Sequence, residues 1–233
     1  MITTVLFDLD GTLLPMDQEI FVKDYFGRLA RFMAPHGYDP QALVETVWKG
    51  TFAMVSNDGA CTNEEAFWRV FTARFGEAAR QDEPLLEAFY QQEFPAVRQV
   101  CGHNPTAAAL VARLRQQGVT VALATNPIFP AVATRQRIRW AGLREEDFQL
   151  VTTYENSRHC KPNPAYYRDV AAALGVDPHE CLMVGNDVGD DLPAAELGMD
   201  VFILTDCLIN KDNVDLSSLP HGGFAQLEKK LGL

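Results

Sequence analysis

Short runs of apolar residues recur along the chain, separated by longer segments whose apolar residues follow helical spacing. The runs lie at residues 2–7, 119–124, 148–152, 181–184 and 201–204. They are continuous rather than alternating with polar residues, which is typical of strands that are covered on both faces. The third run is the weakest of the five. Alternation of such strands with helices predicts an α/β fold, in which a doubly wound parallel sheet carries helices on both sides.

The helical segments between these runs have residues that favour helix ends at both termini. Asparagine or proline precedes them and glycine follows them, as expected for helix starts and stops. The predicted starts are Asn104-Pro105, Pro130 and Asn163-Pro164, and the predicted ends are Gly118, Gly142, Gly175 and Gly198.

Residues 15–100 break the alternation, because they contain four successive amphipathic helical patterns and no strand pattern. The apolar stripe of the second pattern is Leu43, Val47, Trp48, Phe52 and Val55, and a capping box from Thr62 to Glu65 opens the third. Nine of the 14 phenylalanines and two of the three tryptophans lie there. This aromatic content predicts a segment that packs around a small core of its own. We therefore interpret residues 15–100 as an all-helical cap domain, inserted into an α/β core domain formed by residues 1–14 and 101–233.

Composition and charge narrow the classes of function. The 233-residue chain has 20 basic and 31 acidic residues, a net charge of −11, and no cluster of Lys or Arg, which disfavours a nucleic-acid partner. No apolar run is long enough to span a bilayer, and the first residues lack a signal-peptide pattern. Five cysteines without a CxxC pair make a disulfide framework or zinc site improbable. These features predict a cytoplasmic protein without a membrane partner.

Polar residues follow the predicted strands at positions that should meet at one edge of the sheet. Asp8 and Asp10 follow the first strand, Thr125-Asn126 the second, and a loop ending at Lys161 the third. Residues 185–191 follow the fourth strand and are rich in aspartate. Since ligands of open α/β sheets bind outside the carboxyl ends of the strands, this edge is the predicted site.

These side chains match what the transfer of a phosphoryl group requires. Asp8 can act as the nucleophile, and Asp10 can protonate the leaving alcohol and later activate water. Thr125 and Asn126 can hold phosphoryl oxygens, and Lys161 can neutralise charge on the phosphate and on Asp8. The acids suit Mg²⁺, which prefers oxygen ligands. Gly11 and Thr12 supply a sharp turn and a hydroxyl group beside the bound phosphate.

The segment Asp8-Leu9-Asp10-Gly11-Thr12-Leu13 resembles the opening signature of the haloacid dehalogenase (HAD) superfamily. The resemblance continues in the same chain order with Thr125, with Lys161 followed by proline, and with an acidic pair after the fourth strand. It implies an HAD-like core with a helical cap, a Mg²⁺-dependent hydrolase, and an aspartyl-phosphate intermediate. It also implies that a small phosphorylated metabolite is the substrate.

One departure from the family pattern leaves the metal ligands open. Members usually place an aspartate directly after the glycine that ends the fourth strand, and here that residue is Asn186. Asp187 and Asp191 keep the four-residue spacing of the acidic pair, whereas Asn186 and Asp190 keep the distance to the later glycine better. We favour Asp8, Asp10, Asp187 and Asp191 as the metal site, with Asp187 as the direct ligand from this segment.

Other functions on the same fold make different demands. Dehalogenases of this family lack the second aspartate of the opening motif, so Asp10 favours phosphoryl chemistry. A phosphomutase keeps both acids and stays an alternative, and so does a catalytically silent binding module. The substrate, the cap residues that select it and the oligomeric state are not predicted by the sequence.

Overall fold

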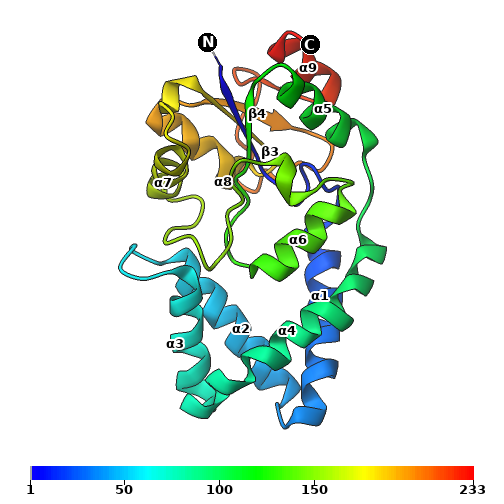
Figure 1. Ribbon diagram of the computed structural model, residues 1–233, viewed down its shortest axis with the longest axis vertical. Coiled ribbons are helices and arrows are strands. Elements are labelled where there is room, and N and C mark those ends of the chain that lie inside the picture. Colours follow the sequence, from blue (N-terminus) through cyan, green and yellow to red (C-terminus); the bar gives the residue numbers. More distant parts are fainter. Residues whose placement is uncertain (1) are drawn as a thin grey trace.

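A computed structural model describes residues 2–233 and contains one five-stranded parallel sheet with the strand order β2-β1-β3-β4-β5 (Figure 1). The strands are β1 (Thr4–Phe7), β2 (Thr120–Leu123), β3 (Cys181–Gly185), β4 (Asp200–Leu204) and β5 (His221–Gly222). Helices flank the sheet on both sides, which confirms the predicted α/β class.

The register of the sheet brings the polar segments after the strands to one edge. Phe7 at the end of β1 lies opposite Leu123 of β2 and Val184 of β3. The next residues continue the ladder, because the Asp8 N–H donates to the carbonyl of Val184 at 2.9 Å. The segments that follow β1, β2 and β3 therefore leave the sheet side by side, with Asp8 in the middle.

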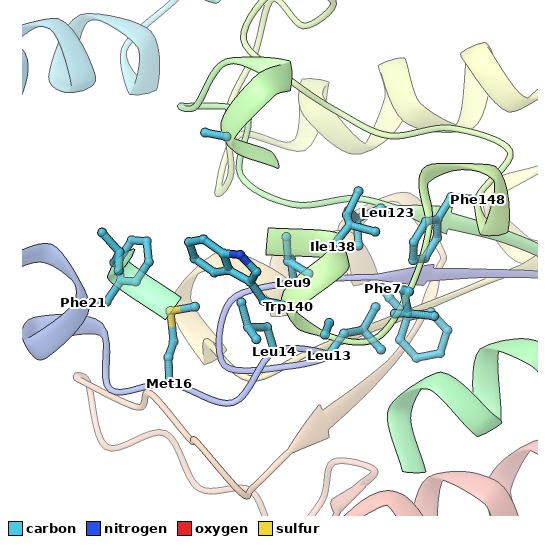
Figure 2. Packing of buried hydrophobic residues seen from close by; sticks show 14 of the residues in the cluster. Phe7, Leu9, Leu13, Leu14, Met16, Phe21, Leu123, Ile138, Trp140 and Phe148 are labelled. Atoms are coloured by element: carbon cyan, nitrogen blue, oxygen red, sulfur yellow. The ribbon is translucent and has the colours of Figure 1, made fainter. Parts of the chain in front are cut away.

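Alternate residues of the strands face two separate helical layers, as the pleat of a sheet requires. Val5 and Phe7 belong to the larger buried cluster, and Leu6 belongs to the smaller one on the opposite face. Figure 2 shows Phe7 among other residues of the larger cluster, including Leu123 and Ile138. Helices α5 (Pro105–Gln116), α6 (Ala131–Trp140) and α9 (Phe224–Leu231) contribute to the larger cluster, and α7 (Pro164–Leu174), α8 (Val188–Asp191) and η6 (Leu192–Leu197) to the smaller.

The helix ends predicted from asparagine and glycine are confirmed. The side chains of Asn104 and Asn163 accept hydrogen bonds from the first turns of α5 and α7, at 3.0 and 2.9 Å. Gly175 ends α7 with a φ of 68°, in the left-handed region that favours glycine.

The segment predicted to form the cap is helical throughout its regular elements and lies at one end of the molecule (Figure 1). Its helices are α1 (Gln18–Met33), α2 (Pro40–Val55), α3 (Asn63–Phe75) and α4 (Glu83–Gln92), with short 3-10 helices η1 (Ala34–His36), η2 (Glu77–Asp82) and η3 (Phe94–Val100). Two further 3-10 helices, η4 (Glu145–Asp147) and η5 (Pro178–Glu180), lie elsewhere in the chain. A capping box opens α3, as predicted.

The predicted separate core of this helical segment is wrong. Its buried aromatic residues belong to the same cluster as one face of the sheet. Phe94 packs on Trp140 of α6 with ring centroids 5.1 Å apart, and Phe21 of α1 lies 6.4 Å from Phe129. These large rings reach across the junction, so the apolar interior continues from the sheet into the helices.

Two other expectations differ in detail. Residues 148–152 form an isolated bridge between Val151 and Leu123 instead of a full strand, although the Leu123 N–H still donates to the carbonyl of Leu150. The short strand β5, which pairs with Ile203 and Leu204 of β4, is not among the five predicted strands. A run of apolar residues does not determine whether all of its backbone N–H and C=O groups form hydrogen bonds with a neighbouring strand.

Among residues 2–233, no helix combines the length and the apolar character needed to cross a bilayer.

Helix α2 carries two large aromatic residues with high exposure. Trp48 is 50% exposed and Phe52 is 71% exposed, whereas Leu43 and Val47 of the same predicted stripe are buried.

Candidate active site

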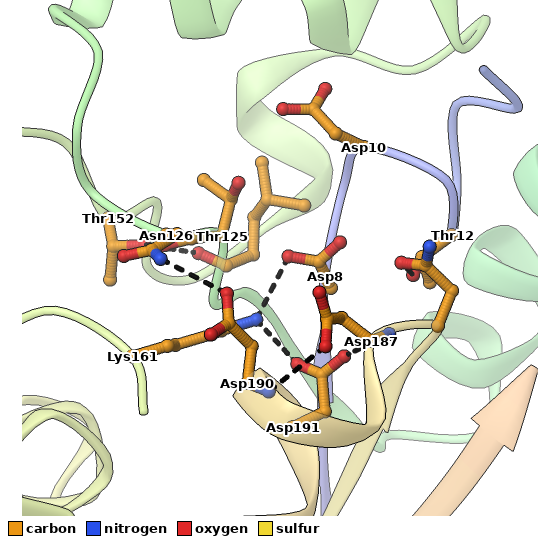
Figure 3. Close-up of polar contacts among 12 residues, drawn as sticks. Asp8, Asp10, Thr12, Thr125, Asn126, Thr152, Lys161, Asp187, Asp190 and Asp191 are labelled. Atoms are coloured by element: carbon orange, nitrogen blue, oxygen red, sulfur yellow. Dashed lines mark hydrogen bonds and ion pairs between the residues drawn. The ribbon is translucent and has the colours of Figure 1, made fainter. Parts of the chain in front are cut away.

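A buried lysine holds two of the predicted carboxylates together at the edge of the sheet. The Lys161 ammonium group donates to Asp8 Oδ1 at 2.9 Å and to Asp191 Oδ1 at 2.7 Å (Figure 3). Lys161 and Asp191 are each only 1% exposed, and Asp8 is 8% exposed. Residues from the first strand end, the 153–163 loop and the fourth predicted strand end therefore meet, as the sequence predicted.

The charges of this cluster depend on one another. Burial by itself lowers the pKa of Lys161, but the carboxylates of Asp191 and Asp8 outweigh burial, so that the pKa lies well above its usual value. Burial raises the pKa of Asp191, and the attraction of Lys161 opposes that rise. Lys161 is therefore a fixed cation beside one oxygen of Asp8, which suits the neutralisation of an anionic ligand.

Removal of the Lys161 charge should destabilise the protein strongly. Lys161→Met should lower the free energy of unfolding by about 3–5 kcal/mol, because it leaves buried carboxylates without their cation. Urea unfolding in metal-free buffer at pH 7 measures this change. The matched control is Lys230→Met, which breaks the exposed 3.1 Å pair with Asp200 and should cost less than about 1 kcal/mol. Equal small changes in both variants would contradict a structural role for the buried cluster.

The segment after β3 positions two aspartates differently. Both oxygens of Asp191 are engaged, since Oδ1 accepts from Lys161 and Oδ2 accepts from the N–H of Asp187 at 3.0 Å. Asp187 caps the short helix α8 through Oδ1, which accepts from the N–H of Gly189 at 2.9 Å. At Gly185 a Cβ atom would overlap with the Asp191 carboxylate, so glycine permits this close approach. Asp187 thus keeps Oδ2 for a ligand, and Asp191 supports the site indirectly.

Asn186 serves the structure of the turn after β1. Its Oδ1 accepts from the Thr12 hydroxyl at 3.0 Å, and its Nδ2 donates to the carbonyl of Cys207 at 2.7 Å. Gly11 has a φ of 85°, and a Cβ atom there would overlap with the Asn186 amide. Asn186 therefore offers no convenient oxygen to a metal ion, which favours Asp187 over Asn186 as the ligand.

Gly11 and Thr12 lie in the tight turn that follows Asp8. The Gly11 N–H donates to the carbonyl of Leu14 at 2.8 Å, and neither Gly11 nor Thr12 lines the cavity beside Asp8. The tight turn directs both residues toward Asn186. These contacts hold the backbone that carries Asp8 and Asp10, and contact of either residue with a substrate stays a prediction.

Thr125 and Asn126 lie on the side of Asp8 away from Thr12, and they line the cavity beside Asp8 (Figure 3). The carbonyl of Thr125 accepts from the hydroxyls of Thr152 at 2.7 Å and Tyr166 at 2.9 Å, which fixes this backbone. Asn126 Nδ2 donates to Asp190 Oδ2 at 3.2 Å. Asp190 therefore keeps one carboxylate oxygen and remains an alternative metal ligand to Asp187.

A buried arginine that the sequence did not identify holds Asp10. Arg137 of α6 is completely buried and forms an ion pair with Asp10 Oδ2. It also donates to the Thr134 hydroxyl at 3.2 Å, and its guanidinium lies 4.3 Å from the centre of the Phe129 ring. The signal in the sequence was its spacing, since Arg137 lies four residues after Ala133, on the buried face of the helix.

The Asp10 carboxylate lies apart from the cluster of Asp8, Lys161 and Asp191 (Figure 3). Its Oδ1 is buried and has no hydrogen-bond partner among residues 2–233. Burial raises the pKa of Asp10 above its usual value, and Arg137 partly opposes this rise. The surroundings of Asp10 therefore differ from those of the cluster formed by Asp8, Lys161 and Asp191.

The cavity at this edge is small and strongly acidic. It has a volume of about 110 Å³, and five aspartates line it against a single lysine: Asp8, Asp10, Asp187, Asp190 and Asp191. An anionic phosphate would be repelled by this charge unless a cation accompanied it. No three Asp, Glu, His or Cys side chains within residues 2–233 are arranged as a closed metal site. The residues fit Mg²⁺, which usually keeps several waters and binds through one or two carboxylates and the substrate phosphate.

Comparisons with known proteins identify the family. The family model described as haloacid dehalogenase-like hydrolase matches residues 2–198. A phosphoserine phosphatase from Thermus thermophilus is 29% identical over 217 residues, which cover 83% of this chain and 84% of the relative.

Solved structures share the fold. A 2-haloacid dehalogenase from Pseudomonas syringae pv. Tomato DC3000 aligns with a TM-score of 0.64 and 21% identity, covering 100% of this chain and 99% of its own. A HAD family enzyme from Bacteroides thetaiotaomicron, in complex with magnesium and inorganic phosphate, aligns with a TM-score of 0.55 and 20% identity, covering 94% and 98%. With the matched family model and the site geometry, these findings show that the chain belongs to the haloacid dehalogenase-like hydrolases, as a phosphatase-like member.

Proposed function

We propose that this protein hydrolyses a small phosphate monoester with the help of Mg²⁺, through an aspartyl-phosphate formed on Asp8. The observation that carries the proposal is the arrangement around Asp8. Lys161 occupies Oδ1 at 2.9 Å, so Oδ2 is left for attack within a cavity that Thr125 and Asn126 also line. A carboxylate beside a fixed cation and polar side chains is suited to covalent phosphoryl transfer.

The reaction then has two displacement steps. In the first, Asp8 Oδ2 attacks phosphorus, the bond between phosphorus and the ester oxygen breaks, and that oxygen takes a proton from Asp10. In the second, Asp10 accepts a proton from water as the water oxygen attacks phosphorus. The bond from phosphorus to Asp8 breaks, which releases inorganic phosphate and regenerates the carboxylate. The buried ion pair with Arg137 favours the ionised form of Asp10 that the second step requires.

The other residues stabilise the phosphoryl group. Lys161 supplies a fixed positive charge, and the polar groups of Thr125 and Asn126 can donate to equatorial oxygens. Asp8 and Asp187 would hold Mg²⁺, with Asp190 as the alternative to Asp187 and Asp191 acting through Lys161 and the Asp187 N–H. When bound, the ion supplies further positive charge to the phosphoryl oxygens.

Metal removal should abolish most of the activity. After exhaustive treatment with EDTA, hydrolysis of p-nitrophenyl phosphate should fall by at least about 100-fold and return when Mg²⁺ is added. Asp187→Asn should raise the Mg²⁺ concentration needed for half-maximal activity more than Asp190→Asn does, because Asp187 is the preferred ligand. Undiminished turnover by the chelated protein would contradict the dependence on a metal ion.

We also propose that residues 15–100 act as a cap that selects the substrate, over a core of residues 1–14 and 101–233. The two segments that join the cap to the core lie side by side. Met16 pairs with Cys101 in an antiparallel bridge, and the Gly102 N–H donates to the carbonyl of Pro15 at 2.7 Å. Catalytic residues come only from the core. The cap contributes Gln18, Phe21 and Val22 to the wall of the active-site cavity.

A further inference from the structure

A second, larger cavity adjoins the active site beneath the helices of the cap. It has a volume of about 330 Å³ and lies between α1–α4 and residues 128–132, which follow the catalytic segment at Asn126. Val22, Ile128 and Phe129 line both this cavity and the active-site cavity. The two spaces therefore share a wall, and a phosphate ester bound beside Asp8 has the larger cavity next to it.

The lining of the larger cavity is mainly aromatic and aliphatic. Aromatic residues from all four cap helices and from the core line it, among them Tyr25, Phe26, Trp48, Phe67, Tyr90 and Phe129. Trp48 packs on Phe26 with ring centroids 5.2 Å apart and yet remains 50% exposed. Half-exposed tryptophan on the wall of an apolar cavity is a common feature of ligand sites, because its ring can cover an apolar ligand.

The charged residues around this cavity disfavour a second anionic group on the substrate. Its acids are Glu83, Glu87 and Glu155, and its only basic residue within the described chain is Arg135. Arg135 is already paired with Glu145 at 2.7 Å. A carboxylate entering this space would meet acids and no uncommitted cation. Polar side chains such as Thr51, Trp68 and Glu155 are a minority on walls that are otherwise aromatic and aliphatic.

We propose that the substrate is a phosphate monoester whose alcohol part is apolar, preferably aromatic, and carries no further negative charge. The phosphate lies beside Asp8 and the apolar group fills the 330 Å³ cavity against Trp48 and Phe129. This assignment rests on the proposed phosphatase function. The preference for an apolar group follows from the walls of the cavity, which are mainly aromatic and aliphatic and carry three acids.

The test compares two alkyl phosphates whose leaving alcohols have similar acidity, propyl phosphate and 3-phenylpropyl phosphate. Burial of the phenyl group should raise kcat/KM by about 10- to 100-fold. Trp48→Ala should remove much of that advantage, so that the ratio of the kcat/KM values for 3-phenylpropyl phosphate and propyl phosphate falls toward one. Phe52→Ala is the matched control, because Phe52 lies one turn away on α2, is 71% exposed and does not line the cavity.

Binding provides a readout that does not depend on turnover. Calorimetry with 3-phenylpropylphosphonate and propylphosphonate should show the same preference for the phenyl group in the wild type and in Phe52→Ala, and a reduced preference in Trp48→Ala. Hydrolysis of propyl phosphate or phosphoserine without any preference for the phenyl compound would overturn the cavity assignment and leave the phosphatase proposal intact. A phenyl preference that survives Trp48→Ala undiminished would also overturn it. Release of phosphate from none of these esters nor from p-nitrophenyl phosphate would refute both proposals.

Discussion

Asp8→Asn should fold and lose nearly all phosphatase activity. We expect kcat to fall by about 10⁴- to 10⁶-fold, the range seen when hydrolases lose a covalent nucleophile or a residue acting with it. The amide keeps the size of the side chain, and Lys161 keeps Asp191 as a partner at 2.7 Å, so the native structure should persist. Rates with p-nitrophenyl phosphate and Mg²⁺, together with a urea unfolding curve, measure the two parts of this prediction.

Trapping of the phosphorylated protein distinguishes a nucleophile from a residue that only binds the metal ion. Wild-type protein that is mixed with ³²P-labelled substrate and quenched in acid should retain label that hydroxylamine removes, as expected for an acyl phosphate. Asp8→Asn should retain none. Asp200→Asn removes one exposed carboxylate outside the site and should behave like the wild type. Unlabelled wild-type protein during active turnover, or labelled Asp8→Asn, would refute Asp8 as the nucleophile.

The sequence predicted the position of the candidate site because the carboxyl ends of the strands can be recognised from it. A parallel sheet aligns its carboxyl ends, so Asp8, Thr125 and the segment after β3 had to emerge at one edge. Lys161 could also be placed, since its loop leads into the capped start of α7. The choice between the alternative metal ligands could be made only from the positions of the side chains. Asn186 is disfavoured as a metal ligand because its side-chain oxygen and nitrogen are hydrogen-bonded to Thr12 and Cys207.

Arg137 shows why the remainder of the site could not be predicted. Helical spacing puts it on the opposite side of α6 from Arg135 and Arg139, but arginine is mostly found at the surface, so the spacing alone does not predict its burial. The structure buries Arg137 completely and leaves Arg135 exposed. Which of them is buried depends on how α6 is rotated against the sheet, and a carboxylate 127 positions earlier in the chain decides whether burial is tolerated.

The cap shows the same limit at the level of packing. Helical periodicity placed Leu43, Val47, Trp48 and Phe52 on one stripe of α2, but the structure buries only the first two. A period indicates which residues share a face, and not how far a neighbouring helix covers that face. The uncovered part of this stripe includes the tryptophan that lines the larger cavity.

Asp10→Asn should reduce the hydrolysis of alkyl phosphates far more than that of aryl phosphates with an acidic phenol. An alkoxide must be protonated as it leaves, whereas p-nitrophenolate leaves without help. General acid catalysis contributes about 100- to 10,000-fold where a proton is required, so the loss for propyl phosphate should exceed the loss for p-nitrophenyl phosphate by about that factor. Single-turnover rates at saturating Mg²⁺ with both substrates give the comparison, because they report formation of the phosphoenzyme alone.

The ion pair with Arg137 makes the ratio of the two losses the informative quantity. Asp10→Asn leaves the completely buried Arg137 without its carboxylate partner, so the variant should also be less stable. Any reduction in folded enzyme lowers the rate for both substrates by the same factor and cancels in the ratio. If Asp10 only fixes the turn or contributes to metal binding, both substrates lose the same factor. Equal losses would therefore remove Asp10 as the proton donor, whereas a large excess loss for the alkyl ester would assign the proton transfer to its carboxyl group.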